Sequence, residues 1–475
     1  RPPRSTLFPY TTLFRSETIM KTQTNTPNME TGSIPRLLAQ LAVPAVVAQI
    51  INLLYNIVDR IYIGHIPGIG AAALTGVGLF APILMLLNAF AMLIGSGGAP
   101  RAAIAMGKKD NDLAEKILGN CFTLLVGLAV VLTVVFYVSA PTLLRLFGAS
   151  DVTLTYASDY ARIYILGSFF VLIVLGMNTF ITTQGFARIS MMTTVIGAVI
   201  NIILDPIFIF VLGMGVKGAA LATVLSQSVG AVWILRFLTG KKTILRLKRS
   251  NMHLELKVFG PCLALGISTF VILSTESLLS ISFTNSLSRY GGDVAVGAMT
   301  ILTSTMQFAM LPLQGIGQGA QPIMSYNYGA RNIDRMKKTF KLHLVISLIY
   351  STLFWLFVQL FPATFAGIFS SDPELVSFTA GALRIYCGAM FLFGIQLACQ
   401  MTFVAIGYAV CSIIVAVVRK FVLLLPLIFI VPMFVSNKTM GVYMAEPIAD
   451  AIAVTFTAIL FSIQFRKALR KLEKA

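Results

Sequence analysis

The sequence predicts an all-α polytopic membrane protein in which twelve transmembrane helices form two pseudo-symmetric lobes of six helices each. Hydrophobic residues make up 57% of the 475 residues and charged residues only 11%, whereas a soluble domain carries about a quarter charged residues. About twelve apolar segments are each long enough to cross a hydrocarbon core of ~30 Å, which takes roughly 20 residues. The two halves of the chain also match each other at one constant offset.

Charged breaks separate the apolar segments and give their approximate bounds. In the first half they predict spans at residues 34–64, 72–106, 113–140, 157–184, 190–213 and 217–239. In the second half they predict spans at 258–289, 294–326, 337–362, 378–406, 410–435 and 441–465. The basic stretch at 240–257 is the longest break and marks the lobe boundary. We therefore expect an N-lobe at 34–240, a cytoplasmic linker at 241–257, a C-lobe at 258–465 and tails at 1–33 and 466–475.

The head of the chain does not resemble a natural N-terminus. Residues 1–16 read RPPRSTLFPYTTLFRS, with no initiating Met and no apolar core of a signal peptide. They resemble a translated sequencing adapter joined to an open reading frame. We expect the natural chain to start at Met20 or Met29.

An internal repeat relates the two halves at an offset of 222 residues. Six spans per half give both halves the same orientation, so their symmetry axis runs along the membrane normal. Parallel repeats of this kind are typical of transporters, with the substrate path between the lobes; a duplicated scaffold with another use is the alternative. The matched residues include Gly95 with Gly317, Gly97 with Gly319, Pro100 with Pro322, Gly107 with Gly329, and Arg162-Ile163-Tyr164 with Arg384-Ile385-Tyr386.

The formal net charge of +18 reflects membrane topology rather than nucleic-acid binding. Lys and Arg gather in alternate loops, as the positive-inside rule describes for cytoplasmic loops. This pattern predicts a multi-pass protein of the cytoplasmic membrane with both termini in the cytoplasm. The expected partners are the lipid bilayer and small molecules, with no nucleic acid, and we expect a monomer.

A polar cluster inside the fifth span stands out. Asn201 and Asp205 are four residues apart, so they share one face of a helix, and Pro206 leaves the carbonyl of Ile202 without its helical partner. An ionisable group at bilayer depth costs about 2.5–3.5 kcal/mol on insertion scales and is a functional hypothesis by default.

Asp59, near the outer end of the first span, is the candidate partner of Asp205; the alternative is an interfacial Asp solvated by water. Two carboxylates in a low-dielectric lobe favour uptake of a proton by one of them. Alternatively, their oxygens, together with those of Asn178, Asn201 and Thr223, form a Na⁺ site, since hard cations take oxygen ligands. The sequence leaves H⁺ and Na⁺ open as the coupling ion and implies no other cofactor. The second half has Ile281, Leu423 and Leu427 at the positions of Asp59, Asn201 and Asp205, so we expect one specialised cation site, in the first half.

The second half carries fewer candidates. Glu276 is the lone acid deep in the seventh span. Its carboxylate either accepts hydrogen bonds locally from Ser274 and Thr275, or has a functional role. That role would be a counter-ion for a cationic substrate or a second protonation site. Glu446 and Asp450, in a less apolar part of the twelfth span, are candidates for the same role. On the eighth span, polar side chains recur at helical spacing and either line the cleft or hydrogen-bond across helices; they are Gln307, Gln314, Gln318 and Gln321.

Several motifs are absent from the sequence. It contains no G-x-x-x-x-G-K-[ST] phosphate loop, no H-E-x-x-H zinc motif and no G-x-S-x-G nucleophile elbow. We therefore expect a protein that is not an enzyme and that takes its energy from an ion gradient.

Four motifs, in this order, resemble the multidrug and toxic compound extrusion (MATE) family: NIVDRIYIG at 56–64, NIILDP at 201–206, GMGVKGAALAT at 213–223 and GIGQGAQPIMSYNYG at 315–329. The resemblance covers residues 34–464. It implies a V-shaped pair of lobes that exports cationic or amphipathic compounds in exchange for H⁺ or Na⁺.

The resemblance also implies roles for single residues. The family's first-lobe cation site matches Asp59, Asn178, Asn201, Asp205 and Thr223. In one branch of the family an acid of the seventh span takes part in coupling, and Glu276 occupies its place. Arg60, beside the first-span acid, departs from the commoner Thr or Ser.

The functional hypothesis is a cation-coupled drug antiporter that works by alternating access. A flippase or exporter of a lipid-linked or metabolite substrate on the same fold is the runner-up; it predicts a strongly cationic cleft. A channel or receptor is a third class and predicts currents without coupled counterflow.

Overall fold

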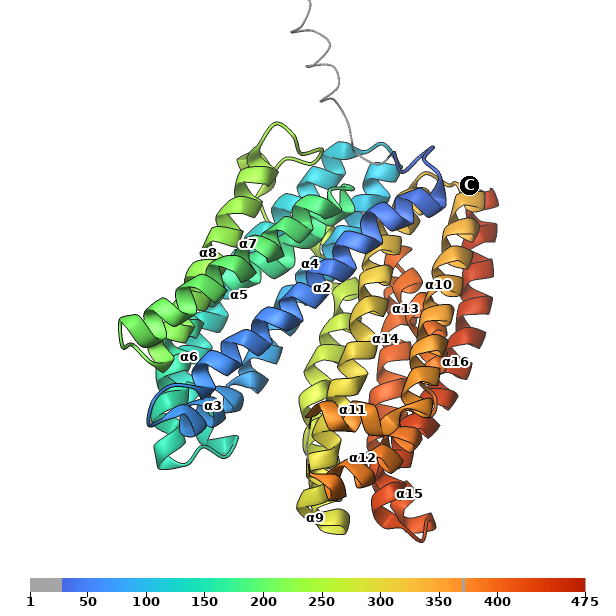
Figure 1. Cartoon of the computed structure of the whole chain (residues 1–475). Coiled ribbons are helices and arrows are strands. Elements are labelled where there is room, and N and C mark those ends of the chain that lie inside the picture. Colours follow the sequence, from blue (N-terminus) through green and yellow to red (C-terminus); the bar gives the residue numbers. More distant parts are fainter. Residues whose placement is uncertain (1–27, 370–371, 475) are drawn as a thin grey trace, which may run out of the picture.

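The computed structural model describes residues 28–369 and 372–474, apart from the side chains at 71, 277 and 293. These residues form helices and connecting turns, without a β-strand. Figure 1 shows two helical bundles that meet at the end where the C-terminus lies and diverge towards the opposite end. The predicted all-α fold with two lobes is confirmed.

The N-lobe contains the first six spans. Its helices are α2 (Ile34–Gly64), α3 (Gly70–Leu79), α4 (Ala81–Gly107), α5 (Asn111–Leu146), α6 (Asp151–Thr183), α7 (Ala187–Pro206), the π-helix η1 (Ile207–Val211) and α8 (Val216–Thr239). Pro82 is the second residue of α4, where a missing N–H costs little. Pro206 is the last residue of α7, and the π-helix η1 begins directly after it.

The C-lobe contains the remaining spans. Its helices are α9 (Leu256–Gly329), α10 (Ile333–Leu360), α11 (Pro362–Phe369), α12 (Pro373–Tyr386), η3 (Met390–Leu392), α13 (Phe393–Ala405), α14 (Ala409–Val417), the π-helix η4 (Val418–Leu424), α15 (Leu425–Phe434) and α16 (Lys438–Lys474). Within α9 two spans meet at Gly292, whose φ of +62° is available to glycine at little cost.

Eleven helices of the described ranges are long and apolar enough to cross a membrane, and the pair Pro373–Tyr386 and Met390–Ala405, bent by 45°, makes a twelfth. At this bend, side chains of α10 bind carbonyl groups that the helix no longer satisfies. The Trp355 indole N–H donates to the Gly388 carbonyl (3.1 Å), and the Ser351 hydroxyl donates to the Phe391 carbonyl (2.8 Å). Because lipid offers no hydrogen bonds, a broken span needs such partners.

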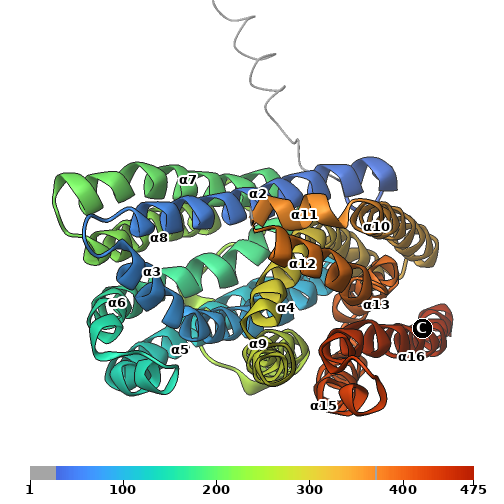
Figure 2. The same cartoon turned by 60° about the horizontal axis from the view of Figure 1, so that its bottom comes forward.

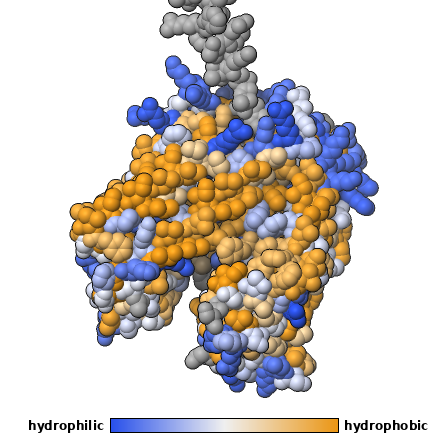
Figure 3. All heavy atoms as spheres, in the orientation of Figure 1, coloured by the Kyte–Doolittle hydropathy of each residue, from blue (hydrophilic) through white to orange (hydrophobic). Residues whose placement is uncertain are grey.

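A broad apolar band crosses the face of the molecule in Figure 3, with hydrophilic residues at the end where the C-terminus lies. At the opposite end a cleft separates the lobes, and it is open in the same view. Figure 2, which brings that end forward, shows α4 and α9 between the outer helices of the two lobes.

Glycine residues allow the lobes to meet at the closed end. An added Cβ on Gly107 would collide with the Tyr326 carbonyl oxygen, and one on Gly329 with the Ile104 carbonyl oxygen. The same holds for Gly266 of α9 against Leu93 of α4. Backbone-to-backbone packing through small residues is typical of close helix contacts in membranes.

The predicted linker at 241–257 packs against the N-lobe. The Gln184 side-chain oxygen accepts hydrogen bonds from the Thr243 hydroxyl (2.7 Å) and from the N–H groups of Ile244 and Leu245 (both 2.8 Å). Leu245 is fully buried in the N-lobe core. Further along, the Asn120 side-chain oxygen accepts from the Glu255 N–H (2.7 Å). These contacts attach the linker to the N-lobe.

Candidate cation site in the N-lobe

Asn201, Asp205 and Thr223 form a buried hydrogen-bonded group between α7 and α8. The Asn201 amide donates to Asp205 Oδ1 (3.1 Å) and to Thr223 Oγ1 (3.4 Å). The Thr223 hydroxyl in turn donates to the Ala219 carbonyl (3.1 Å). Asp205 is fully buried and Asn201 nearly so. The four-residue spacing on α7 thus places both polar groups towards α8, away from lipid.

Asp59 of α2 completes the group, because its side chain contacts that of Asp205. Three buried oxygens here have no hydrogen-bond partner within the part of the chain that the structure describes: Asp59 Oδ1, Asn201 Oδ1 and Asp205 Oδ2. All three are acceptors, so what they lack is a positive charge or a proton. Arg60 is exposed and leaves the contact between the carboxyl groups in place.

Aromatic side chains of α6 cover this group. The Tyr160 side chain contacts Thr223. The rings of Tyr160 and Tyr164 stack at 5.8 Å, and the Phe80 ring packs edge-on against both, at 5.6 and 5.4 Å. Neither tyrosine is among the predicted site residues, although two tyrosines four residues apart in an apolar span are a usable signal in the sequence.

Asn178, the remaining predicted member, lies elsewhere in the N-lobe. Its amide donates to the Ser190 carbonyl (3.2 Å), and its oxygen accepts from the Thr193 hydroxyl (3.4 Å). Thr193 precedes Asn201 by eight residues, which is about 12 Å along a helix. Asn178 therefore joins α6 to the first turns of α7, while the other four predicted residues meet.

In the C-lobe, Glu276 has a basic partner from another span. Lys420 Nζ lies 2.8 Å from Glu276 Oε1. Lys420 is buried, whereas the Glu276 side chain keeps 45% of its surface exposed. Thr275 and Ser274 do not bind Glu276: Thr275 donates to the Val271 carbonyl, and the Ser274 hydroxyl oxygen has no hydrogen-bond partner among the described residues.

Arg419, adjacent to Lys420, joins the two acids of α16. Its Nε donates to Asp450 Oδ1 (2.7 Å), one terminal nitrogen lies 3.7 Å from Glu446 Oε1, and the guanidinium sits 5.1 Å from the centre of the Phe393 ring. Arg419 and Lys420 stand on the π-helix η4, a rare geometry that is frequent at functional sites. The C-lobe therefore also contains a cluster of ionisable groups, which consists of two bases and three acids. The expectation of one specialised cation site, in the first half, stays a prediction.

The glutamines of the eighth span lie in the second half of α9. Gln307 is exposed and Gln314 is half-buried. Neither belongs to the ionisable clusters of the two lobes.

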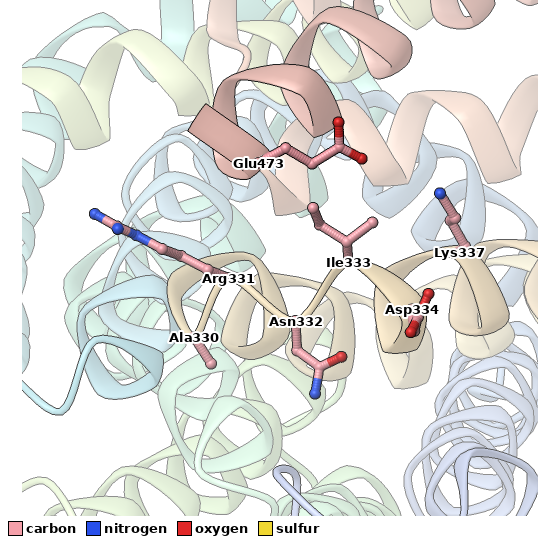
Figure 4. A pocket seen from close by; sticks show the side chains of 7 residues that line it. All are labelled: Ala330, Arg331, Asn332, Ile333, Asp334, Lys337 and Glu473. Carbon is pink, nitrogen blue, oxygen red and sulfur yellow. The ribbon is translucent and has the colours of Figure 1, made fainter. Parts of the chain in front are cut away.

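A surface pocket at the closed end is a separate feature (Figure 4). Six of its lining residues belong to the turn between α9 and α10 and its flanks, and Glu473 comes from α16. The pocket contains charges of both signs, among them Arg331, Asp334 and Lys337. It lies at the end of the molecule opposite the cleft.

The two lobes, the buried polar clusters within them and the cleft between them define a membrane transporter built from a repeated unit. A family model described as MatE matches residues 44–207 and 268–430, more than half of the chain, and the chain belongs to this family.

Curated relatives support the assignment. The "Multidrug export protein MepA" of Staphylococcus haemolyticus is 25% identical over 366 residues, which cover 77% of this chain and 80% of that protein. The "Probable multidrug resistance protein YoeA" of Bacillus subtilis is 24% identical over 433 residues, covering 89% and 92%.

Solved structures share the fold. A crystal structure of MATE in the bent conformation aligns with a TM-score of 0.89 at 23% identity, covering 95% of this chain and 99% of that one. The outward-facing conformation of a multidrug resistance MATE family transporter aligns with a TM-score of 0.88 at 24% identity and the same coverage.

Proposed function

We propose that the protein is a cation-coupled antiporter that exports cationic or amphipathic compounds by alternating access. The single observation that carries the proposal is the contact between Asp59 and Asp205, with three buried oxygens that lack a positive partner. A proton shared between the carboxyl groups, or a Na⁺ ion held by the three oxygens, supplies what is missing. The names of the curated relatives, which refer to multidrug export and resistance, support the substrate class.

The cycle follows from the position of the site. With both termini in the cytoplasm, the cleft opens to the outside, and the site takes its cation from there. Neutralising the carboxyl pair repacks α2 against α7, which favours separation of the lobes at the closed end. A difference in cation affinity between the two states of a few kcal/mol is sufficient to shift their populations.

Transport by the purified protein in liposomes tests the proposal. A fluorescent quaternary ammonium dye serves as substrate, and pH and Na⁺ gradients are imposed separately. We expect one of these gradients to drive dye movement and Asp205→Asn to abolish it. Asp159→Asn, which removes an acid paired with Lys217 at the surface (3.5 Å), should retain it. Driven transport by Asp205→Asn at the wild-type rate would refute the proposal.

The same assay separates the alternatives. A flippase would move a lipid-linked precursor and leave the dye untouched. It requires a strongly cationic cleft, whereas the Arg419 and Lys420 charges are paired with acids. A channel would dissipate the ion gradient without substrate.

A further inference from the structure

The C-lobe cluster contains one acid more than its bases can neutralise. Lys420 is hydrogen-bonded to Glu276 (2.8 Å) and Arg419 to Asp450 (2.7 Å). Glu446 is the third acid, and its contact with Arg419 is longer, at 3.7 Å. Among the described residues no donor forms a hydrogen bond to Glu446. With every group ionised, the three acids and two bases carry a formal charge of −1.

Glu446 has little access to water that could offset its charge. Only 7% of its side-chain surface is exposed. An uncompensated carboxylate in such surroundings is costly and takes up a proton where one is available. The titratable groups that face Glu446 are Arg419 and Lys420 of η4, Glu276 of α9, Asp450 of α16 itself, and Tyr386 with Cys387 of the bent tenth span. The bases in this set are already bound to other acids.

The cluster lies in the C-lobe where the cation site lies in the N-lobe. Tyr164 is near Asp59, and Tyr386, its counterpart 222 residues later, is near Glu446. The N-lobe site draws on the first, fourth, fifth and sixth spans, and the C-lobe cluster on the corresponding seventh, tenth, eleventh and twelfth. The repeat thus encloses a buried ionisable group in each lobe, with different residues.

We propose that Glu446 is a second proton-exchange site, which binds and releases one proton in each transport cycle. The proposal rests on the ion-coupled transport proposed above. In the binding step, a hydronium ion in the cleft gives its proton to the Glu446 carboxylate, an O–H bond forms, and water remains; release is the reverse. Protonation leaves two neutral pairs, Arg419–Asp450 and Lys420–Glu276. Na⁺ is disfavoured because the Arg419 guanidinium, 3.7 Å away, repels a metal cation.

The number of coupled protons is the first test. In liposomes with the membrane potential clamped at zero, the quantity to measure is the limiting ratio of the substrate concentrations on the two sides of the membrane. Each exchanged proton multiplies this ratio by about tenfold per pH unit. We expect Glu446→Gln, which mimics the protonated acid, to lower this ratio by about tenfold per pH unit relative to wild type. Glu473→Gln, at the exposed end of the same helix, should match wild type. An unchanged ratio in Glu446→Gln would overturn the proposal.

The outcome with Asp205→Asn separates this proposal from the proposed function. If Asp205→Asn transports like wild type, the proposed function fails. If Asp205→Asn is inactive and Glu446→Gln keeps the wild-type ratio, only the second site fails.

Infrared difference spectroscopy of the full-length protein in lipid gives a test that does not depend on transport. When the pH is lowered, wild type should show a C=O stretching band of a protonated carboxyl group that Glu446→Gln lacks. Asp450→Asn serves as the second variant. It frees Arg419 to bind Glu446 directly, so the same band should be lost or shifted to lower pH. Identical spectra for wild type and both variants would exclude protonation of Glu446.

Discussion

Gly107 and Gly329 form a reciprocal contact at the closed end of the molecule. Gly107 packs against the carbonyl of Tyr326, and Gly329 against the carbonyl of Ile104. Both the glycines and the two carbonyl residues are related by the 222-residue repeat. The pseudo-twofold axis therefore passes between these helix ends, and the closure of the cleft on this side depends on the absence of two Cβ atoms.

Substitution of either glycine by alanine should open this end. A Cβ forced into a packed contact costs about 1–3 kcal/mol, which shifts the population of the closed state by roughly 5- to 150-fold. We expect Gly107→Ala and Gly329→Ala to slow efflux. In a background where Cys262, which is buried at the interface, is the remaining cysteine, both substitutions should also speed its labelling by a maleimide. Gly127→Ala, where the added Cβ has open space, is the control; equal labelling of all variants would contradict this role.

A natural cysteine pair offers a way to lock the lobes together. Cys121 of α5 and Cys262 of α9 are both buried, and their side chains contact each other. A membrane-permeable oxidant should join them, stop efflux and yield to a reductant. Cys121→Ser should be resistant, whereas Cys399→Ser, within the C-lobe, should be inhibited like wild type. Inhibition of Cys121→Ser to the same extent would show that the oxidant acts elsewhere.

Thr223 and Tyr160 should tune the affinity for the coupling ion. Thr223→Val removes an acceptor for Asn201 and the contact of Tyr160. Loss of one such hydrogen bond costs about 0.5–1.5 kcal/mol, so the ion concentration for half-maximal transport should rise about 2- to 10-fold, with the maximal rate retained. Tyr160→Phe should act in the same direction. Ser228→Ala, whose hydroxyl bonds only within its own helix, should leave the ion dependence unchanged.

The Lys420–Glu276 pair should show strong coupling in a double-mutant cycle. Lys420→Met leaves the C-lobe with an additional unpaired acid. The loss of stability should be smaller than the ~3–5 kcal/mol of a fully buried pair, because Glu276 is half-exposed. The double variant Lys420→Met, Glu276→Gln should recover most of the lost Tm. Lys438→Met, which replaces an exposed base over Tyr290, is the control for the loss of a lysine. Additive effects of Lys420→Met and Glu276→Gln on Tm would contradict direct pairing.

Gln184 should control how firmly the linker is held. Its side-chain oxygen accepts three hydrogen bonds from residues 243–245. In Gln184→Leu the Thr243 hydroxyl keeps the Leu245 carbonyl as an acceptor (2.9 Å), whereas the buried Leu245 N–H loses its partner at a cost of about 1–3 kcal/mol. We expect a lower Tm and faster tryptic cleavage at Lys241 and Lys242. Thr239→Val, which removes one local helix hydrogen bond at the same end, should change neither; equal cleavage rates would show that Gln184 does not fix the linker.

The sequence sufficed for the fold and for four residues of the N-lobe group because both leave strong local signals. Apolar length predicts spans, and an acid in a span stands out against its neighbours. The C-lobe cluster left a weaker signal. Arg419 and Lys420 are basic residues in a span, but their acids come from α9 and α16, 144 and 31 residues away in sequence. Only the packing of three helices on one another reveals which charges neutralise which. Asn178 lies on an adjacent helix but beside Ser190 and Thr193 rather than beside Asn201, because the depth of a residue within a bundle depends on how the helices pack.

The attachment of residues 243–255 to the N-lobe has a practical consequence for how the chain can be divided. The peptide between Lys241 and Lys242 is exposed, yet the segment after it is bound to Gln184 and Asn120. If the chain is divided at this position, the second fragment begins with residues 243–255, which bind to the first fragment. The two halves, expressed as separate polypeptides, should therefore associate through this segment.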